Sequence, residues 1–348
     1  MLSRFSGFLV ATALLVVIAG CNSPVSTSQI LPAASKSSDV QSQSSAVQLY
    51  GEPILRGAHK FTEYKIPSAN AGPDRIVTGS DGALWFTEQT NEVSRLGRVT
   101  TTGSFSEIRL PFGSEPSHVA WADGSLFVTF DKLAYVDRIT PGGHIGTTYV
   151  QSSTRGVVGG RGQRVWFTEF ESGMVGIVDV DFGGATTEYF VPTQGSEPYD
   201  VTFAGNRDEL WFTEYGASKI GRMTGTGKFT EFPTPSQPQG LGFGADGALW
   251  FTETTANKIG RMTLKGKVTE YPLPTQNAGP VVITAGPDGA LWFTEFTSSK
   301  IGRITTSGGI KEIATPDAGA DPTGITTGPD HKIWFVENKA NAIVRLDR

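Results

Sequence analysis

The side chains best suited to chemistry stand just after a proline that recurs along the chain. At the first two positions after this proline the repeat copies differ, whereas the rest of each copy is nearly constant. Polar groups that converge on one place form the usual kind of ligand site, so we predict that these positions bind a ligand; the alternative is a solvated loop rim. The predicted binding residues are Asp74, Arg75, Ser117, His118, Tyr199, Asp200, Gln239 and Thr323.

The repeat that carries these positions predicts a β-propeller. Each copy has the form Leu-Trp-Phe-Thr-Glu followed by Lys-Ile-Gly-Arg, and its aromatic anchor recurs every 39–45 residues. This period, with several short strands per copy, is typical of propeller blades, and the aromatic and β-branched residues disfavour a helical array. We predict an all-β fold, a seven-bladed β-propeller of four-stranded antiparallel blades. The anchors are Trp85, Phe127, Trp166, Trp211, Trp250, Trp292 and Trp334.

The two ends of the chain predict how the ring closes. A copy of the outer strand follows each of the first six anchors, but the chain stops soon after the seventh. The missing copy lies ahead of the first blade, at residues 61–67. We expect this N-terminal strand to complete the last blade, because closure removes the free edges of an open sheet. The propeller domain is predicted to span residues 56–348.

Two charged residues are nearly constant among the copies. A glutamate in six of the seven blades suggests catalysis, but a residue repeated in nearly every copy is expected to serve the scaffold. The glutamates and arginines lie on neighbouring antiparallel strands, so we expect cross-strand ion pairs, while the aromatic anchors pack between blades. The glutamates are Glu88, Glu169, Glu214, Glu253, Glu295 and Glu337, and the arginines are Arg98, Arg138, Arg222, Arg261, Arg303 and Arg345.

The first residues are typical of an exported lipoprotein. Arg4 precedes an apolar run at residues 8–19 that is too short to span a bilayer. An Ala-Gly pair then comes directly before Cys21, the only cysteine, and resembles a bacterial lipobox. We predict a signal peptide at residues 1–20, lipidation of Cys21, and a disordered Ser- and Gln-rich linker through residue 55. The domain is then expected in the bacterial cell envelope, held to a membrane by the lipid alone.

Composition and motifs exclude several classes of partner and reaction. The net charge is −5 and no basic run is present, so no nucleic-acid partner is expected. The sequence has no phosphate-binding glycine loop, zinc-ligand spacing or nucleophile elbow. A closed ring of this size is expected to be a monomer that takes a small molecule, a peptide or a glycan.

Three segments resemble the streptogramin B lyase (virginiamycin B lyase) family. They are residues 257–263, 269–275 and 286–295, and the resemblance covers about residues 58–348. Members of that family are seven-bladed propellers that open a cyclic depsipeptide antibiotic by elimination across its ester bond, using magnesium and histidine. The resemblance therefore implies the propeller fold and, for the activity, a magnesium-dependent carbon–oxygen lyase.

The family resemblance also indicates which residues would form a catalytic site. In the family, a histidine of the sixth blade helps to bind the substrate, and a Glu-Pro-His sequence of the last blade supplies a metal ligand and a proton-transfer histidine. These positions hold Val281, Asp321 and Thr323 here, and a second metal-holding acid corresponds to Glu337. The resemblance implies Mg²⁺ held by the two carboxylates. His118 of the second blade does not match either family histidine in position, but it is the remaining candidate for catalysis.

Two classes of function remain open. The first is a surface-tethered binding module, which the missing histidines, the intact repeats and the lipid anchor favour. The second is an enzyme, either a metal-dependent lyase of the family's type or a hydrolase like the propeller lactonases, acting through Asp321, Glu337 and His118. A purely structural role in the envelope is a third alternative, since one fold serves many functions.

Overall fold

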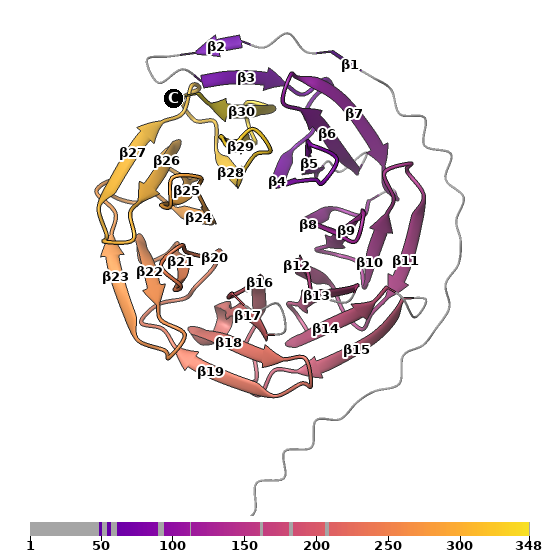
Figure 1. The fold of residues 1–348 in the computed structure, drawn as a ribbon, viewed down its shortest axis with the longest axis vertical. Helices are drawn as coiled ribbons and strands as arrows, with labels where there is room; N and C mark the ends of the chain where they lie inside the picture. The colour runs from indigo at the N-terminus through magenta and orange to yellow at the C-terminus, as the bar shows by residue number, and fades with distance from the viewer. Residues whose placement is uncertain are drawn as a thin grey trace, which may run out of the picture.

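Seven antiparallel sheets surround a central axis as the blades of a propeller (Figure 1). The computed structural model describes residues 49–50, 54–56, 61–89, 94–111, 113–160, 163–180, 184–205 and 209–347. Each blade begins with a strand at the axis and ends with a strand at the rim. The predicted all-β, seven-bladed fold is confirmed.

The first four blades follow the chain in order from the axis outward. Blade 1 contains β4 (Pro73–Thr78), β5 (Ala83–Glu88), β6 (Arg95–Thr100) and β7 (Ser104–Arg109). Blade 2 contains β8 (Pro116–Ala122), β9 (Ser125–Phe130), β10 (Tyr135–Ile139) and β11 (Ile145–Tyr149). Blade 3 contains β12 (Thr154–Gly159), β13 (Arg164–Glu169), β14 (Met174–Asp179) and β15 (Ala185–Phe190). Blade 4 contains β16 (Pro198–Phe203), β17 (Glu209–Glu214), β18 (Lys219–Thr224) and β19 (Phe229–Pro233), with a 3-10 turn at Tyr215–Ala217.

The remaining blades complete the ring. Blade 5 contains β20 (Leu241–Phe243), β21 (Leu249–Glu253), β22 (Lys258–Met262) and β23 (Val268–Pro272). Blade 6 contains β24 (Pro280–Ala285), β25 (Leu291–Glu295), β26 (Lys300–Ile304) and β27 (Ile310–Ala314). Blade 7 contains β28 (Pro322–Thr327), β29 (Ile333–Glu337), β30 (Ala342–Leu346) and, from the N-terminal side, β3 (Phe61–Lys65).

The N-terminal strand closes the ring as predicted. β3 pairs antiparallel with β30 along its whole length, from Phe61 opposite Leu346 to Lys65 opposite Ala342. Two short strands add a fifth member to their sheets: β1 (Leu49–Tyr50) pairs with β7, and β2 (Ile54–Arg56) pairs with β3. The signal peptide, Cys21 and most of the predicted linker lie outside the described residues. Within the described part, no helix is long and apolar enough to cross a membrane.

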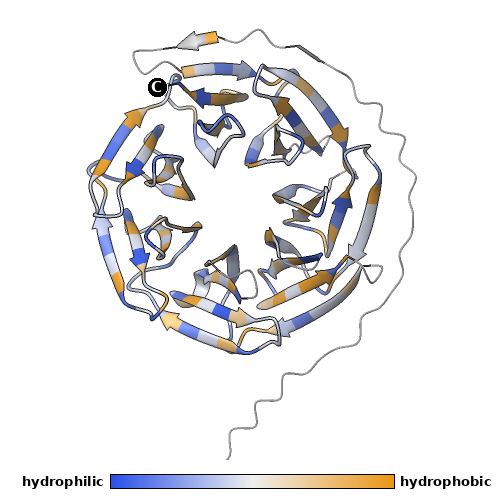
Figure 2. Ribbon diagram, viewed as in Figure 1, coloured by the Kyte–Doolittle hydropathy of each residue, from blue (hydrophilic) through white to orange (hydrophobic). Residues whose placement is uncertain are grey.

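The aromatic anchors form the core between blades, as predicted. Trp85 of blade 1 packs with Leu126 and Val128 of blade 2, and the other anchors are equally buried. Figure 2 shows that apolar residues are spread around the whole ring, in every blade. Burial of large aromatic side chains is the main favourable contribution to the stability of such a fold.

The predicted ion pairs between glutamate and arginine are wrong. Arg98 lies opposite Trp85, while Glu88 lies opposite Arg95. Trp85 and Glu88 are three positions apart on one strand, so their side chains point to opposite faces. The guanidinium of Arg98 stacks over the Trp85 ring at 5.6 Å and pairs with Asp81 at 2.8 Å.

The same three-residue unit recurs in blades 5, 6 and 7. In it, an aspartate of the hairpin turn accepts a hydrogen bond from the indole Nε1 and pairs with the arginine, as Asp246 does with Trp250 at 3.1 Å and Arg261 at 2.7 Å. The arginine is therefore part of the inter-blade scaffold, but the glutamate is left without it. The glutamates are therefore buried carboxyl groups, and their pKa values are altered.

Candidate ligand-binding site at the channel mouth

A bulge at the start of the inner strand places the variable side chains in every blade except blade 5. In blade 2, Pro116 pairs with Phe130 and the next paired residue is Val119, so Ser117 and His118 fall in the irregularity. A bulge bends its strand and redirects the side chains it contains. The residue before the proline has a positive φ in blades 1, 2, 4, 6 and 7, as at Glu115 with a φ of 45°. The predicted binding residues other than Gln239 thus share one backbone geometry at the mouth of the channel.

Threonine hydroxyl groups hold these bulges in place. In blade 4 the Asp200 N–H donates to Thr213 Oγ1 at 3.0 Å, and this hydroxyl donates to the Gln239 carbonyl of blade 5 at 2.9 Å. The threonine of the Trp-Phe-Thr-Glu segment makes the same link between other neighbouring blades, for example from Thr252 to the Val281 carbonyl at 2.8 Å. Each hydroxyl therefore fixes one inner strand against the next.

Thr323 makes this link where the ring closes. Blade 7 has Val336 in place of the usual threonine, and a valine cannot donate a hydrogen bond. Instead, Thr323 Oγ1 donates to the Asp74 carbonyl of blade 1 at 2.9 Å. The residue at the family's proton-transfer position is thus engaged in holding blade 7 against blade 1.

Four predicted residues from three blades form a buried polar cluster. Arg75 hydrogen-bonds with the side chain of Tyr199. His118 Nε2 lies 4.0 Å from Asp200 Oδ1, and the rings of His118 and Tyr199 meet edge to face at 6.1 Å. Arg75 and His118 are only 7% and 8% exposed. Arg75 Nε and His118 Nε2 have no hydrogen-bond partner among the described residues.

Burial shifts the pKa values of the titratable residues in this cluster. The pKa of His118 is lowered well below its ordinary value, first by burial and then by the positive charges of Arg75 and Arg155. His118 is therefore neutral, and its Nδ1 lies 2.9 Å from Ser117 Oγ. Burial raises the pKa of Asp200, although Arg75 and two backbone N–H groups oppose this. A neutral imidazole beside an arginine can accept or donate one hydrogen bond to a ligand.

Asp74 and Gln239 border this cluster, and Asp74 Oδ2 lies 3.7 Å from Arg75 Nε. Gln89 Nε2 lies 3.4 Å from Asp74 Oδ2 and donates to the Pro116 carbonyl at 2.8 Å. Burial raises the pKa of Asp74, and the neighbouring Arg75 lowers it by less. Gln239 Nε2 donates to the Tyr199 hydroxyl at 3.3 Å, which ties blade 5 to the cluster.

The structure adds an aromatic wall that the sequence did not predict as part of the site. The guanidinium of Arg155 lies 4.5 Å from the Phe170 ring and 4.7 Å from the Tyr199 ring. Tyr199 also packs against Tyr215 at 6.0 Å, and Arg155 pairs with Asp131 at 3.4 Å. The position after the conserved glutamate, which holds Phe170 and Tyr215, differs between copies, and that variation was the signal available in the sequence.

The two predicted metal ligands have different partners. Asp321 Oδ2 pairs with Lys339 Nζ at 2.7 Å. Glu337 is buried, and its carboxyl group lies within 4.8 Å of one oxygen each of Glu63 and Asp317. Burial, followed by the charges of those two neighbours, raises the pKa of Glu337 to about 8.

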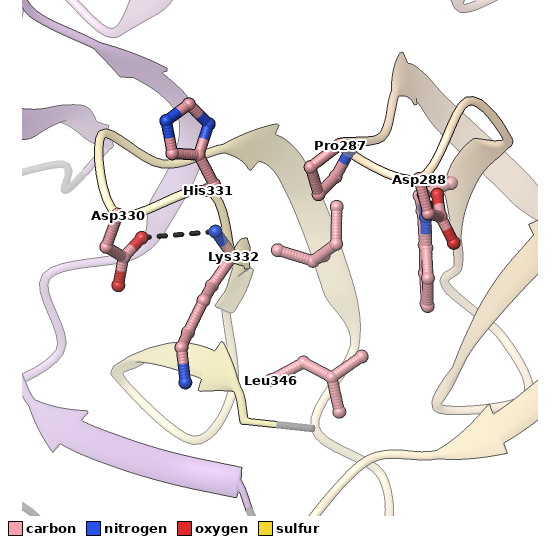
Figure 3. Close-up of a pocket in the computed structure, with 8 residues that line it drawn as sticks. Pro287, Asp288, Asp330, His331, Lys332 and Leu346 are labelled. Atoms are coloured by element: carbon pink, nitrogen blue, oxygen red, sulfur yellow. Dashed lines mark hydrogen bonds between the residues drawn. The ribbon is translucent and has the colours of Figure 1, made fainter.

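A cavity lies at the other end of the strands, between blades 6 and 7 (Figure 3). Its volume is about 240 Å³, and its lining includes Trp292, His331 and Leu346. Charged groups around it are paired, such as Lys332 with Asp347 at 2.7 Å. It contains none of the predicted binding residues, so the candidate site remains the mouth of the channel.

Known proteins share this fold and much of the sequence. The family model of the virginiamycin B lyase family matches residues 54–208 and 148–348. The chain is 34% identical over 135 residues to a virginiamycin B lyase of Nocardia farcinica, a match that covers 38% of this chain and 46% of that protein. The alignment thus spans about half the length of this relative.

Two solved structures extend the likeness over the whole propeller. Virginiamycin B lyase from Staphylococcus aureus is 34% identical with a TM-score of 0.77, over 82% of this chain and 98% of that one. A catalytically inactive variant of the same enzyme with quinupristin gives a TM-score of 0.76 at 34% identity, over 82% and 98%. This seven-bladed propeller with a polar channel mouth belongs to the virginiamycin B lyase family.

Proposed function

We propose that this protein is a lipid-anchored, monomeric binding propeller of the cell envelope, which holds a small molecule, a peptide or a glycan at the channel mouth and does not take nucleic acid. The observation that carries the proposal is the pair of buried atoms Arg75 Nε and His118 Nε2, which have no hydrogen-bond partner among the described residues. The nearest carboxylates lie beyond hydrogen-bond range, with Asp74 Oδ2 3.7 Å from Arg75 Nε and Asp200 Oδ1 4.0 Å from His118 Nε2. Leaving such groups unpaired costs about 1–3 kcal/mol each. A ligand that supplies hydrogen-bonding groups there recovers this cost.

The residues at the family's histidine positions support binding over elimination. Val281 has no group that exchanges a proton, and the hydroxyl of Thr323 is engaged with the Asp74 carbonyl. Loss of a general acid or base lowers a rate by about 10²–10⁴. Burial lowers the pKa of His118 well below its ordinary value, so this imidazole is a weak proton acceptor, and it lies in blade 2.

A metal-dependent lyase is the alternative, and family membership favours it. In that alternative, Asp321 and Glu337 would hold Mg²⁺, which would stabilise negative charge on a substrate oxygen. Lys339 already neutralises Asp321, and burial favours the neutral form of Glu337. Both effects oppose cation binding. A propeller hydrolase acting through His118 is the other enzymatic possibility.

Quinupristin distinguishes these possibilities. We expect it to remain cyclic when incubated with the protein and Mg²⁺, because both histidines of the family are absent. Liquid chromatography with fragment-ion mass spectrometry measures this, since elimination gives a linear isomer of unchanged mass whereas hydrolysis adds one water. A linear isomer would establish the lyase, and a product with added water the hydrolase; an active virginiamycin B lyase serves as the positive control.

The proposed lipidation of Cys21 gives a second testable prediction. In a bacterial expression host fed an alkyne-bearing fatty acid, the wild-type chain is expected to carry the label and to sediment with membranes. Cys21→Ser removes the only thiol that can be acylated, so the label and the membrane association are expected to be lost completely. Ser23→Ala is the matched control and should keep both. Retention of the label in Cys21→Ser would contradict the lipoprotein assignment.

A further inference from the structure

Blades 1, 4, 5 and 6 place one basic side chain between two glutamates near the mouth end of their strands. In blade 6, Glu295 of the second strand lies opposite Lys300 of the third. The Lys300 ammonium pairs with Glu312 of the outer strand at 2.9 Å and donates to the hydroxyl of Thr275, which lies in the segment that leads out of blade 5. Such a row has one cation for two carboxyl groups. The equivalent basic residues are Arg95, Lys219 and Lys258.

Blade 7 departs from this row at two positions. Ala342 lies opposite Glu337, where the other rows have the basic residue. Asp317, in the segment that leads out of blade 6, takes the position that Thr275 has in the segment out of blade 5. A basic residue comes instead from the outer strand, where Lys65 lies opposite Ala342. With Glu63 of the outer strand, the row of blade 7 has three carboxyl groups for one ammonium.

The three carboxyl groups of this row converge. One oxygen each of Glu63, Asp317 and Glu337 lies within 4.8 Å of the other two. Among the described residues, no other three acidic or histidine side chains lie so close together. They come from β3, from the segment after β27 and from β29, three parts of the chain that meet where the ring closes (Figure 1). Closure of the ring therefore assembles this group.

Glu337 accepts no hydrogen bond within this group. Its side chain is 0% exposed, and neither Oε1 nor Oε2 has a hydrogen-bond partner among the described residues. The hydroxyl of the nearby Thr315 donates to two backbone carbonyls instead. A buried carboxyl group without a donor is costly, and contact with a cation would remove that cost.

The Lys65 ammonium marks a place where oxygen atoms already hold a positive charge. It pairs with Glu63 and with Asp317, the latter at 3.4 Å, and it donates to the Ala340 carbonyl at 3.0 Å. The Lys65 side chain is 44% exposed, so a competing cation can displace it into solvent.

The donor set fits a hard divalent cation, because carboxylate and carbonyl oxygens are the ligands that such ions prefer. Oxygens on opposite sides of Ca²⁺ are about 4.8 Å apart, whereas those around Mg²⁺ are about 4.2 Å apart at most. The spacing within the group therefore suits Ca²⁺.

We infer that Glu63, Asp317 and Glu337 form a calcium site, in which Ca²⁺ takes the place of the Lys65 ammonium and ties the closing strand β3 to the rest of the ring. The unfolded chain does not hold these carboxylates together, so bound Ca²⁺ stabilises the folded ring. The site goes beyond the proposed function, since it shares no residue with the predicted ligand-binding set. It also differs from the metal site that the family resemblance implies, because Asp321 pairs with Lys339 and is not in the group.

Isothermal titration calorimetry of the full chain at pH 8.5 tests the site, since at this pH most of the proton on Glu337 has already left. We expect one Ca²⁺ per chain with a Kd of about 10⁻⁴–10⁻³ M, as in extracellular calcium modules. Saturating CaCl₂ should raise the Tm by about 5 °C relative to NaCl of equal ionic strength. Mg²⁺ should bind more weakly, and tighter binding of Mg²⁺ than of Ca²⁺ would overturn the choice of ion.

Variants of the group and a matched control identify the ligands. Asp317→Thr introduces the residue that blade 6 uses at this position and should weaken Ca²⁺ binding by about tenfold or more, because the site loses a charged ligand. Glu295→Gln, at the equivalent inner glutamate of blade 6, is the control and should bind Ca²⁺ like the wild type. Lys65→Met should bind Ca²⁺ more tightly, because the competing ammonium is gone.

The contrary outcomes are distinct. Absence of Ca²⁺ binding, or wild-type affinity in Asp317→Thr, would overturn the site. Loss of binding in Asp321→Asn but not in Asp317→Thr would assign the ion to the family's metal position instead. Unchanged or weaker binding in Lys65→Met would overturn the exchange with the ammonium. None of these results affects the proposed function, which depends on Arg75 and His118 at the channel mouth.

Discussion

The folded protein is expected to lose stability steadily as the pH rises from 5 to 8. Six of the blades carry a fully buried glutamate near the mouth end of the second strand, such as Glu214 in blade 4. Blade 2 has Phe130 there and a buried Asp137 on its third strand instead. The pKa is raised to about 8 for Glu88, Glu169, Glu214 and Glu337 and to about 7 for Glu253, Glu295 and Asp137.

The cause is burial, joined for the six glutamates by a second carboxyl group. Glu214 is desolvated and faces Glu231 of the outer strand, and both effects favour the protonated form. Glu231 itself is stabilised as an anion by Thr193 and Lys219, so its pKa is lowered. One proton is thus retained between the two carboxyl groups. The arrangement explains why the glutamate needs no arginine.

The sign of the pH effect follows from these values. In the unfolded chain a glutamate has a pKa of about 4.5, so above that pH the unfolded state gives up protons that the folded state still holds. The stabilisation is complete below pH 4.5 and is lost as the pH passes the folded pKa values of 7 to 8. Each retained proton contributes a slope of about 1.4 kcal/mol per pH unit, and each kcal/mol corresponds to about 2–4 °C in Tm.

Thermal unfolding followed by circular dichroism between pH 5 and 8.5 measures the effect. Glu214→Gln is expected to raise the Tm at pH 8.5 and to reduce the slope, because the amide is neutral at every pH. Glu171→Gln, at an exposed position, is the control and should leave the profile as in the wild type. A Tm that stays constant or rises over this range would contradict the prediction.

Removal of the closing strand is expected to abolish cooperative folding. A chain that begins at residue 68 lacks β3 and leaves β30 without its outer partner. Phe61 and Tyr64 are both 2% exposed, and Tyr64 stacks on Trp334 at 5.4 Å. The loss of each buried aromatic side chain costs about 3–5 kcal/mol, and the total stability of a domain is about 5–15 kcal/mol.

A chain that begins at residue 58 keeps β3 and is the matched control; it should unfold in a single transition. Urea unfolding followed by tryptophan fluorescence compares the two chains. As a milder variant, Tyr64→Ala removes the stacking on Trp334 and the hydrogen bond to the Thr101 carbonyl of blade 1, and should lower the midpoint. A cooperative transition at the wild-type midpoint in the chain from residue 68 would show that the ring does not depend on this strand.

In blades 7 and 2 a residue of the repeat is replaced, and another residue takes over its role. Val336 removes a hydroxyl that the other inter-blade contacts use, and Thr323 restores the contact from the opposite strand. In blade 2, the carboxyl group moves from the second strand to Asp137, where it accepts a hydrogen bond from Thr147 at 2.6 Å. The space at the former position is filled by Phe130. These exceptions fall in the blades that supply the mouth or close the ring.

Periodicity alone was sufficient to predict the number of blades, their strand order, the buried aromatic anchors and the closing strand at residues 61–67. These features depend on local pattern, because alternation along a strand and the count of copies are properties of the chain itself. The eight variable positions after the proline were also predictable, and the structure brings Arg75, His118, Tyr199 and Asp200 together.

Only the tertiary structure decided which groups contact one another across strands and blades. In blades 1, 5, 6 and 7 the arginine pairs with a turn aspartate instead of the repeated glutamate, because the register sets it opposite the tryptophan. Arg155 and Phe170 join the mouth because blade 3 docks beside Tyr199 of blade 4. The arginine–aspartate pair depends on the register between strands of one blade. The contact of Arg155 with Tyr199 depends on the packing of neighbouring blades, and it joins residues that no single copy of the repeat contains.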